Sequence, residues 1–467
     1  MEQEKDITMQ EKDVANESEH RSSSEHRRHS HHHHHHSHHS HHHHHHRHRK
    51  HKKSSKNSRN KQAFKQFLRN NRKKLIVFCA ALFFCFCSVL AGTFMDNMMH
   101  RGEDHSGSNG TAAGSTEVVT EGMVSIGVSV FDQPVSLINS AVQAHLEASA
   151  EADPHEIYTQ YNGDNVRLDI GAPLKLSYKI SAAPSNYVVS SAVFTLSENA
   201  DLSNPVRKTV PAGKDAVEFT NLKTGTAYYY RLDVTFTNGV ESAVLGDLTT
   251  AYGPRMMTVD GGYNLRDVGG WLVSGGKRIK QGLLYRGCEI DGAVEPQYCL
   301  TEAGKSYMLT QMNIKTDMDL RNKADTPNGA DVLGANVKHT YYGSSSYTSA
   351  LSAENADTMR RIFADLADPA QYPAYLHCTY GLDRTGTVCY LLGALLGMDE
   401  DNLLKEYQLS AMSQGYVATD GMTNFVQYVH ALPGFTLSEK VETYLLGVGV
   451  TPAQIQSIRD IFLEDIQ

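Results

Sequence analysis

Residues 377–386 read His-Cys-Thr-Tyr-Gly-Leu-Asp-Arg-Thr-Gly and combine a nucleophile with a cation at close spacing. Cys378 and Arg384 stand with five residues between them. A cysteine thiolate can attack phosphorus, and the planar guanidinium of an arginine can hold two phosphoryl oxygens at once, which a lysine cannot do. This pairing predicts hydrolysis of a phosphate ester through a cysteinyl-phosphate on Cys378. The alternative interpretation is a buried structural cysteine beside an unrelated arginine.

The local sequence also predicts the backbone that such chemistry requires. A strand over residues 373–377 precedes a short glycine-containing loop, and a helix is expected to open at Thr385. Backbone N–H groups and the positive end of the helix dipole then converge on one concavity that fits a phosphoryl group. The same field, with His377 adjacent, should stabilise the thiolate of Cys378, and the Thr385 hydroxyl can hydrogen-bond its sulfur. The expected phosphate-binding residues are Thr379, Tyr380, Gly381, Leu382 and Thr385.

Strand and helix patterns alternate around this loop throughout residues 253–467. Strands are expected over residues 337–341 and 373–377, and helices over residues 354–366 and 385–396. Near the end of the chain, Thr451, Pro452 and Gln454 supply an N-cap, a first-turn proline and a capping-box glutamine for one more helix. Alternating elements of this kind predict an α/β layer fold.

The loop sequence resembles the phosphate-binding loop of cysteine-dependent protein tyrosine phosphatases, dual-specificity phosphatases included. Residues 264–270 (NLRDVGG), 284–286 (LYR), 319–321 (DLR) and 403–410 (LLKEYQLS) follow the order seen in bacterial tyrosine phosphatases whose loop reads His-Cys-x-x-Gly-Lys-Asp-Arg-Thr-Gly. The resemblance covers about 210 residues. It implies a central, mostly parallel sheet flanked by helices and an enzyme that works without a metal or any other cofactor.

The resemblance also implies a general acid. The only tryptophan, Trp271, is followed by a leucine, so the mobile Trp-Pro-Asp loop of many eukaryotic tyrosine phosphatases is absent. Asp383 holds the position inside the loop from which the bacterial group protonates the leaving oxygen. Asp319 and Asp267 are the alternatives, and each could instead cap a turn or pair with an arginine. Residues that either line the pocket or brace the loop are Asn264, Arg266 and Arg321.

One departure from the bacterial group concerns the substrate. That group has a lysine where this chain has Leu382, so a cation that could hold a second phosphate is missing. We therefore expect a protein tyrosine or dual-specificity phosphatase acting on a phosphorylated protein or a small phosphomonoester. A phytase-like inositol phosphate or phosphoinositide phosphatase is one alternative. An inactive phosphate-binding or adhesion module is another, although the intact Cys378, Asp383 and Arg384 speak against it.

Residues 153–252 show a different pattern, with apolar side chains at every second position. Leu174, Leu176 and Ile180 alternate with polar residues, and residues 228–236 do so again before an Asn-Gly turn. The stretch 222–234 (LKTGTAYYYRLDV) resembles a fibronectin type III domain, with Tyr228 at the tyrosine-corner position. This implies an antiparallel β-sandwich that acts as a spacer or binds a protein or cell-wall partner.

Residues 75–95 contain no charged side chain, and a helix of this length spans about 31 Å, which matches the hydrocarbon core of a bilayer. Arg72, Lys73 and Lys74 precede this stretch and Asp96 follows it, which keeps the N-terminus in the cytoplasm. We therefore expect one transmembrane helix in the cell membrane and an extracellular catalytic domain. A cleaved secretory signal is the alternative.

Residues 1–74 are of low complexity and contain two runs of six histidines. Their formal charge is +10, whereas the rest of the chain carries −18, which together give −8. We expect a disordered cytoplasmic tail that is drawn to anionic lipid by its lysines and arginines. The acidic remainder argues against a nucleic-acid partner. Residues 96–152 are expected to be a linker, with a helix over residues 134–150.

Overall fold

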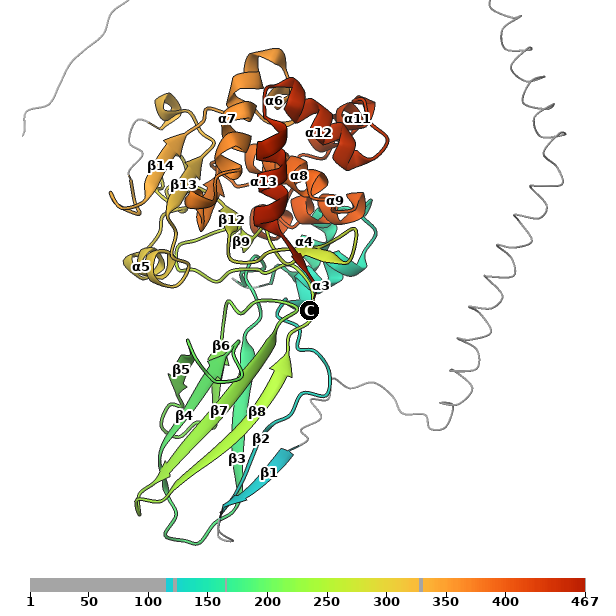
Figure 1. Ribbon diagram of the computed structural model, residues 1–467. Helices are drawn as coiled ribbons and strands as arrows, with labels where there is room; N and C mark the ends of the chain where they lie inside the picture. Colours follow the sequence, from blue (N-terminus) through green and yellow to red (C-terminus); the bar gives the residue numbers. More distant parts are fainter. Residues whose placement is uncertain (1–114, 121–123, 164–165, 327–330, 467) are drawn as a thin grey trace, which may run out of the picture. The chain divides into compact units, whose positions relative to one another are not determined.

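The computed structural model describes residues 115–120, 124–163, 166–326 and 331–466 (Figure 1). The predicted tail (1–74) and the predicted transmembrane segment (75–95) lie outside these residues. In the described part of the chain, no helix has both the length and the apolar character needed to cross a membrane.

Two antiparallel four-stranded sheets share one apolar core in the amino-terminal part of the described chain (Figure 1). The buried side chains alternate along the strands, as Leu174, Leu176 and Leu232 illustrate. Alternation of this kind directs one face of each sheet to the core. In spatial order, the first sheet contains β1 (Ser115–Thr120), β2 (Val124–Ser129), β3 (Leu174–Ala182) and β6 (Ala216–Phe219), and the second contains β5 (Val206–Thr209), β4 (Val189–Ser197), β7 (Ala227–Phe236) and β8 (Glu241–Thr249).

The period-two pattern is confirmed in β3 and β7, the strands that the sequence marked most clearly. The hydroxyl of Tyr228 accepts a hydrogen bond of 2.8 Å from the backbone N–H of Lys223, five residues upstream. This is the contact that defines a tyrosine corner. The turn after β7 closes through a bond of 2.9 Å from Gly239 N–H to the carbonyl of Phe236. The fibronectin type III identity stays a prediction.

The boundary of the sandwich differs from the prediction, because β1 and β2 lie inside the range 96–152 that was expected to be a linker. The three alternating apolar residues of β2, Val124, Ile126 and Val128, are too few for a clear sequence signal, yet all three are buried in the sandwich core. The chain then leaves the sandwich and returns at β3. We call the intervening residues 138–171 the arm, since Ile138 and Gly171 bridge each other at its base.

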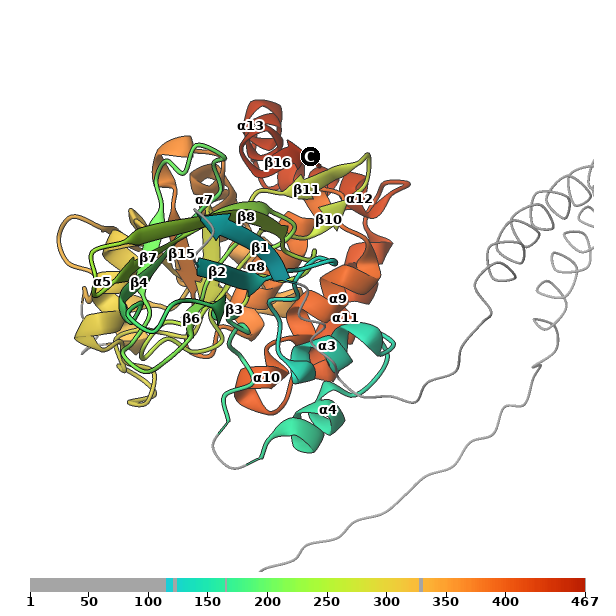
Figure 2. The ribbon, with the colours of Figure 1, turned by 90° about the horizontal axis from the view of Figure 1, so that it is seen from below.

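The arm carries α3 (Ser140–Glu147), capped by Asn139, and α4 (Pro154–Tyr161), capped by Asp153. Helix α3 is shorter than predicted because Val135 is extended and donates its N–H to Thr249, at a distance of 2.8 Å. Ala141 and Val142 are buried in the core of the carboxy-terminal domain, and α4 packs on α10 (Ala411–Gln414) (Figure 2). The arm, although it interrupts the sandwich, is therefore packed as part of the carboxy-terminal domain.

A five-stranded sheet in the order β14-β13-β15-β12-β9 forms the centre of the carboxy-terminal domain. All neighbouring pairs are parallel except β12 and β9, so the prediction of a mostly parallel sheet flanked by helices is confirmed. The strands are β9 (Arg266–Asp267), β12 (Leu284–Gly287), β13 (Thr316–Asp319), β14 (Lys338–Tyr341) and β15 (Ala374–His377). A small separate sheet contains β10 (Leu272–Val273), β11 (Lys277–Ile279) and β16 (Leu463–Asp465).

Helix α8 (Asp383–Leu395) follows β15 directly and is buried along most of its length. It begins two residues before the predicted start, whereas the predicted capping box of the last helix is confirmed, with Thr451 and Gln454 bonding each other's backbone N–H groups. The other helices are α5 (Glu302–Thr310), α6 (Tyr347–Ala350), α7 (Ala356–Leu366), α9 (Glu400–Gln408), α11 (Thr419–Ala431), α12 (Leu437–Gly447) and α13 (Pro452–Phe462), with 3₁₀ turns at Lys323–Asp325, Ala353–Asn355 and Pro369–Gln371.

Candidate active site

The loop between β15 and α8 places Cys378 at its first position, with only 2% of the residue exposed. Gly381 has a φ of 63°, in the left-handed region. A Cβ atom there would lie 2.3 Å from the carbonyl oxygen of Gly287, so the loop approaches β12 too closely for any larger residue. We call residues 378–382 the Cys378 loop.

Three consecutive carbonyl groups of the Cys378 loop accept hydrogen bonds from the surrounding protein. Thr379 O accepts from Glu289 N–H at 2.9 Å, Tyr380 O from the Asn264 amide at 3.0 Å, and Gly381 O from Arg286 at 2.6 Å. In the described part of the chain, the backbone N–H groups of residues 379–382 have no acceptor. N–H groups without acceptors in consecutive peptide units are a feature of anion nests, which is the arrangement that the sequence predicts for this loop.

A buried group of two arginines and one carboxylate lies behind the loop. Glu406 of α9 accepts from Arg266 at 2.8 Å and from Arg286 at 2.6 Å. Burial alone would raise the pKa of Glu406, but the two guanidinium groups outweigh it and lower this pKa. Arg266 also bonds the side-chain oxygen of Asn264 at 2.5 Å. Asn264 and Arg266 therefore brace the loop, which decides between the two roles expected for them.

His377 precedes Cys378 and is fully buried. Its Nε2 lies 2.9 Å from Asp317 Oδ1, and its Nδ1 lies 3.1 Å from the carbonyl oxygen of Cys378. Burial would lower the pKa of His377, but Asp319 and Asp317 outweigh it and raise the pKa to about 9. The imidazolium is thus held against the carboxylates of β13, and it contacts Cys378 through the backbone of that residue.

Arg321 does not reach the Cys378 loop, because three carboxylates surround its guanidinium. It pairs with Asp319 at 2.7 Å, with Asp291 at 3.0 Å and with Glu289. Glu289 is the same residue whose N–H holds Thr379 O. Arg321 therefore braces the loop indirectly and does not line its mouth.

Two of the three candidate acids are fixed in structural roles. Asp267 is buried and accepts from Arg255 at 3.0 Å and from the N–H groups of Gly269 and Gly282. Burial alone would raise the pKa of Asp319, but His377, His339 and Arg321 hold it well below its usual value. A carboxyl group held ionised, as that of Asp319 is, is a poor proton donor. Burial instead raises the pKa of Asp267, but its hydrogen bonds occupy both of its carboxyl oxygens.

Asp383 is the first residue of α8 and is partly exposed. Its Oδ1 accepts a hydrogen bond from the hydroxyl of Tyr347, and its Oδ2 has no partner among the described residues. Arg384, the next residue, reaches back to the Thr379 hydroxyl at 3.4 Å and has no carboxylate partner in the described part of the chain. These two side chains are thus the acid candidate and the cation that remain available at the loop.

Two loop residues differ from their predicted environments. The Thr385 hydroxyl, expected to bond the Cys378 sulfur, is buried and has no hydrogen-bond partner among the described residues. Thr385 is the third residue of α8, and not its first as predicted. Leu382 is 1% exposed and belongs to the core of the domain, so its side chain is a packing group.

Aromatic side chains that the sequence did not single out extend from the loop. The Tyr380 ring meets Tyr298 edge-on, with 6.1 Å between ring centroids, and Tyr298 lies 5.3 Å from Tyr263. The Tyr380 hydroxyl donates to Glu295, and the Tyr298 hydroxyl donates to Gln414 at 3.0 Å. We call Tyr263, Tyr298 and Tyr380 the aromatic row; no local sequence signal joins them, because they lie on separate loops.

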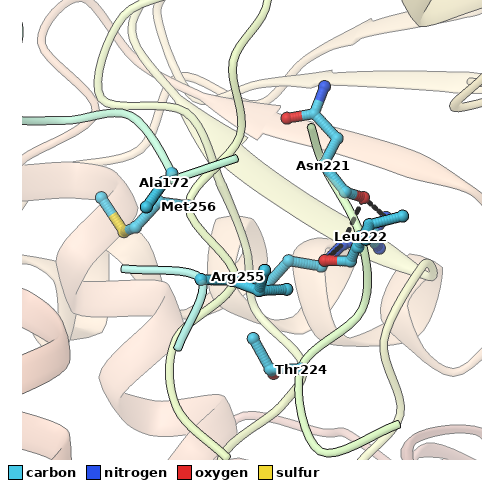
Figure 3. A pocket seen from close by; sticks show the side chains of 8 residues that line it. Ala172, Asn221, Leu222, Thr224, Arg255 and Met256 are labelled. Carbon is cyan, nitrogen blue, oxygen red and sulfur yellow. Dashed lines mark hydrogen bonds between the residues drawn. The ribbon is translucent and has the colours of Figure 1, made fainter. Parts of the chain in front are cut away.

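A narrow crevice lies elsewhere, where the sandwich meets the carboxy-terminal domain (Figure 3). Arg255 crosses it and donates to the carbonyl oxygens of Asn221 at 2.6 Å and Leu222 at 3.2 Å. The crevice has no room for a water molecule, so it is a packing feature and not a substrate site. In the described part of the chain, no cluster of His, Cys, Asp or Glu residues has the arrangement of a metal site.

Comparison with known proteins agrees with the loop geometry. Residues 257–464 match the model of the tyrosine phosphatase family. The carboxy-terminal domain is of the tyrosine phosphatase type. The chain is also similar to the solved core catalytic domain of the PP-IP phosphatase SIW14 from S. cerevisiae, in complex with citrate, at 16% identity and a TM-score of 0.20, covering 33% of this chain and 94% of that one. No curated protein matches the chain.

This assignment leaves 138–171 outside the matched region, although the arm packs into the phosphatase domain. The matched residues 257–464 lie within residues 253–467, the range of the predicted catalytic domain.

Proposed function

We propose that the chain is a phosphomonoester hydrolase that acts on phosphotyrosine in proteins, through a cysteinyl-phosphate on Cys378. The observation that carries the proposal is the Cys378 loop. Among the described residues, the backbone N–H groups of residues 379–382 have no acceptor, while three carbonyl groups of the loop are held by Glu289, Asn264 and Arg286. An anion bound there lies against a thiol at one end and Arg384 at the other.

The proposed reaction has two displacements at phosphorus. In the first, the Cys378 sulfur forms a bond to phosphorus as the ester oxygen leaves, and Asp383 gives that oxygen its proton. In the second, water attacks phosphorus, Asp383 takes a proton from the water, and the sulfur–phosphorus bond breaks to return the thiolate and phosphate. Arg384 holds the equatorial oxygens in both steps. No metal or other cofactor takes part.

Two features favour an aryl phosphate over a polyphosphate. Tyr380, in the loop itself, is partly exposed and is the member of the aromatic row that can meet the ring of a bound phosphotyrosine. Arg266, Arg286 and Arg321 are each bound by carboxylates, which leaves Arg384 as the cation for one phosphate group. An inositol phosphate or phosphoinositide would need further cations.

The proposal includes the location predicted from the sequence. We place the enzyme in the cell membrane through residues 75–95, with the basic tail in the cytoplasm and the phosphatase domain outside. The sandwich then acts as a spacer or binds a protein or cell-wall partner, and nucleic acid is not a partner.

The test compares the full chain with two variants on a phosphotyrosine peptide, a phosphoinositide and an inositol hexakisphosphate, under reducing conditions. Cys378→Ser should abolish turnover yet still bind inorganic phosphate, whereas Arg384→Ala should lose both. Cys299→Ser is the matched control, because Cys299 is exposed. A wild-type chain that prefers the inositol phosphate would refute phosphotyrosine as the proposed substrate. Turnover by Cys378→Ser would refute the cysteinyl-phosphate mechanism.

A further inference from the structure

The arm contacts the segment that braces the Cys378 loop. Asp169, which is 2% exposed, accepts the backbone N–H of Asn264 at 2.7 Å. Asn264 in turn donates its side-chain amide to Tyr380 O in the loop. We propose that Asp169 is a positioning residue of the active site, acting on the Cys378 loop through Asn264. The inference rests on the proposed function only for its kinetic readout.

Asn264 needs support because its backbone is in a strained conformation. Its φ is 51°, in the left-handed region that non-glycine residues seldom adopt. Such a conformation persists only where neighbouring groups fix it. The carboxylate of Asp169 satisfies the N–H of this residue and so favours the conformation that aims the amide at Tyr380 O.

A second arm residue holds Asp169 in place. Arg167 donates to both oxygens of Asp169, at 3.0 and 2.9 Å, and to the carbonyl oxygen of Gly262 at 2.7 Å. Its guanidinium also lies over the ring of Tyr263, 4.2 Å from the ring centroid. Arg167 and Asp169 together therefore contact three consecutive residues, 262, 263 and 264, next to the loop.

The effect of the contact between Asp169 and Asn264 can be tested without undocking the arm, because other residues also hold the arm on the carboxy-terminal domain. Elsewhere on the arm, His145 bonds the carbonyl oxygen of Lys405 at 3.1 Å, and Lys405 donates to Leu146 O at 2.6 Å. Ala141 and Val142 add buried apolar surface. These contacts should keep the arm docked when Asp169 is replaced, so loss of the Asn264 contact can be measured in a folded protein.

The experiment compares Asp169→Ala and Asp169→Asn in the full chain. Alanine removes the acceptor for Asn264 N–H, whereas asparagine keeps one oxygen in place. We expect Asp169→Ala to weaken the binding of inorganic phosphate about tenfold or more, with a comparable loss in kcat/KM for p-nitrophenyl phosphate, because small misplacements of such a loop are costly. Asp169→Asn should recover most of both.

The matched control is Asp153→Ala on the same arm. Asp153 is exposed, caps α4 through the N–H of His155 at 2.9 Å, and has no contact with Asn264. It should lower the melting temperature without changing phosphate binding. Unchanged phosphate binding in folded Asp169→Ala, or an equal loss in Asp153→Ala, would overturn the inference. A wild-type chain without hydrolytic activity would refute the proposed function but not the positioning role of Asp169. That role is decided by the affinity for inorganic phosphate, which can be measured without turnover.

Discussion

The hydroxyl of Tyr347 donates a hydrogen bond to the carboxylate of Asp383. The same hydroxyl lies 2.7 Å from the Tyr407 hydroxyl, which accepts the backbone N–H of Ala418 at 3.2 Å. Burial, then Tyr407 and Asp383, raise the pKa of Tyr347 well above its ordinary value, so it keeps its proton. In the resulting chain of hydrogen bonds, Ala418 N–H donates to Tyr407, Tyr407 donates to Tyr347, and Tyr347 donates to one oxygen of Asp383. The other oxygen of Asp383 remains available.

This series predicts a role for Tyr347 in holding the proposed acid. Tyr347→Phe removes the hydrogen bond that fixes one oxygen of Asp383, worth about 0.5–1.5 kcal/mol, and frees Asp383 to rotate. We expect turnover of a phosphotyrosine peptide to fall about tenfold, with a smaller fall for an activated aryl phosphate. Tyr428→Phe is the control, because Tyr428 is 45% exposed on α11. Equal turnover by Tyr347→Phe and the wild type on both substrates would contradict the role.

Asp383 itself gives a sharper leaving-group test. Asp383→Asn should reduce turnover of phosphotyrosine far more than turnover of an activated aryl phosphate, because the activated leaving group needs little protonation. Steady-state kinetics on a series of aryl phosphates measures this as a steeper dependence on leaving-group basicity. Equal losses across the series would indicate an electrostatic or structural role for Asp383.

The ion pairs of His377 predict how stability depends on pH. Its pKa of about 9 in the folded state lies above the ordinary 6.5, so folding favours the protonated form. The stabilisation is fully present below about pH 6.5 and is lost as the pH rises through 9. The pKa of His339, 3.5 Å from Asp319, is also raised and acts in the same direction.

Chemical denaturation between pH 6 and 10 measures this effect. The wild type should lose up to about 3 kcal/mol of unfolding free energy over that range. In His377→Gln most of this dependence should disappear. His430→Gln is the control, because His430 pairs with Glu400 on the surface. A wild-type profile that is flat from pH 6 to 10 would contradict the prediction.

The buried pair of arginines around Glu406 predicts a large loss of stability. Glu406→Gln leaves two buried guanidinium groups without their charge partner, which typically costs about 3–5 kcal/mol. Urea unfolding should report this loss. The control, Glu442→Gln, breaks the partly exposed pair with Arg459 and should cost less than about 1 kcal/mol. Similar losses in the two variants would show that the buried group contributes no more than a surface pair.

The sequence predicted the Cys378 loop because its chemistry is contiguous in the chain. The contacts that complete the site could not be found in this way, since they join residues far apart. Tyr347 and Asp383 are separated by 36 positions, Asp169 and Asn264 by 95, and Arg266 and Glu406 by 140. No local pattern states which partners such side chains have.

The periodicity of apolar residues likewise located helices and strands better than it predicted the domain to which each of them belongs. The alternation in β3 and β7 and the capping box at Thr451 depend on neighbours in sequence, and they were predicted correctly. A helix was predicted where α3 lies, but α4 and the packing of the arm were missed, because both helices are short and their buried positions match a surface on another domain. Leu382 illustrates the same limit. The sequence shows that no cation stands at this position, but the burial of the leucine depends on tertiary packing.

The predicted orientation in the membrane can be tested on intact cells that express the full chain. The positive flank before residue 75 predicts that residues 96–467 lie outside. Added protease should therefore remove the phosphatase domain and spare the tail, as followed by antibodies against each end. Replacing Arg72, Lys73 and Lys74 with glutamine should weaken this bias and give a mixed orientation. A cytoplasmic protein that stays uncut serves as the control for cell integrity. Cleavage of the tail alone would indicate the opposite orientation. Release of residues 96–467 without protease would indicate a cleaved signal.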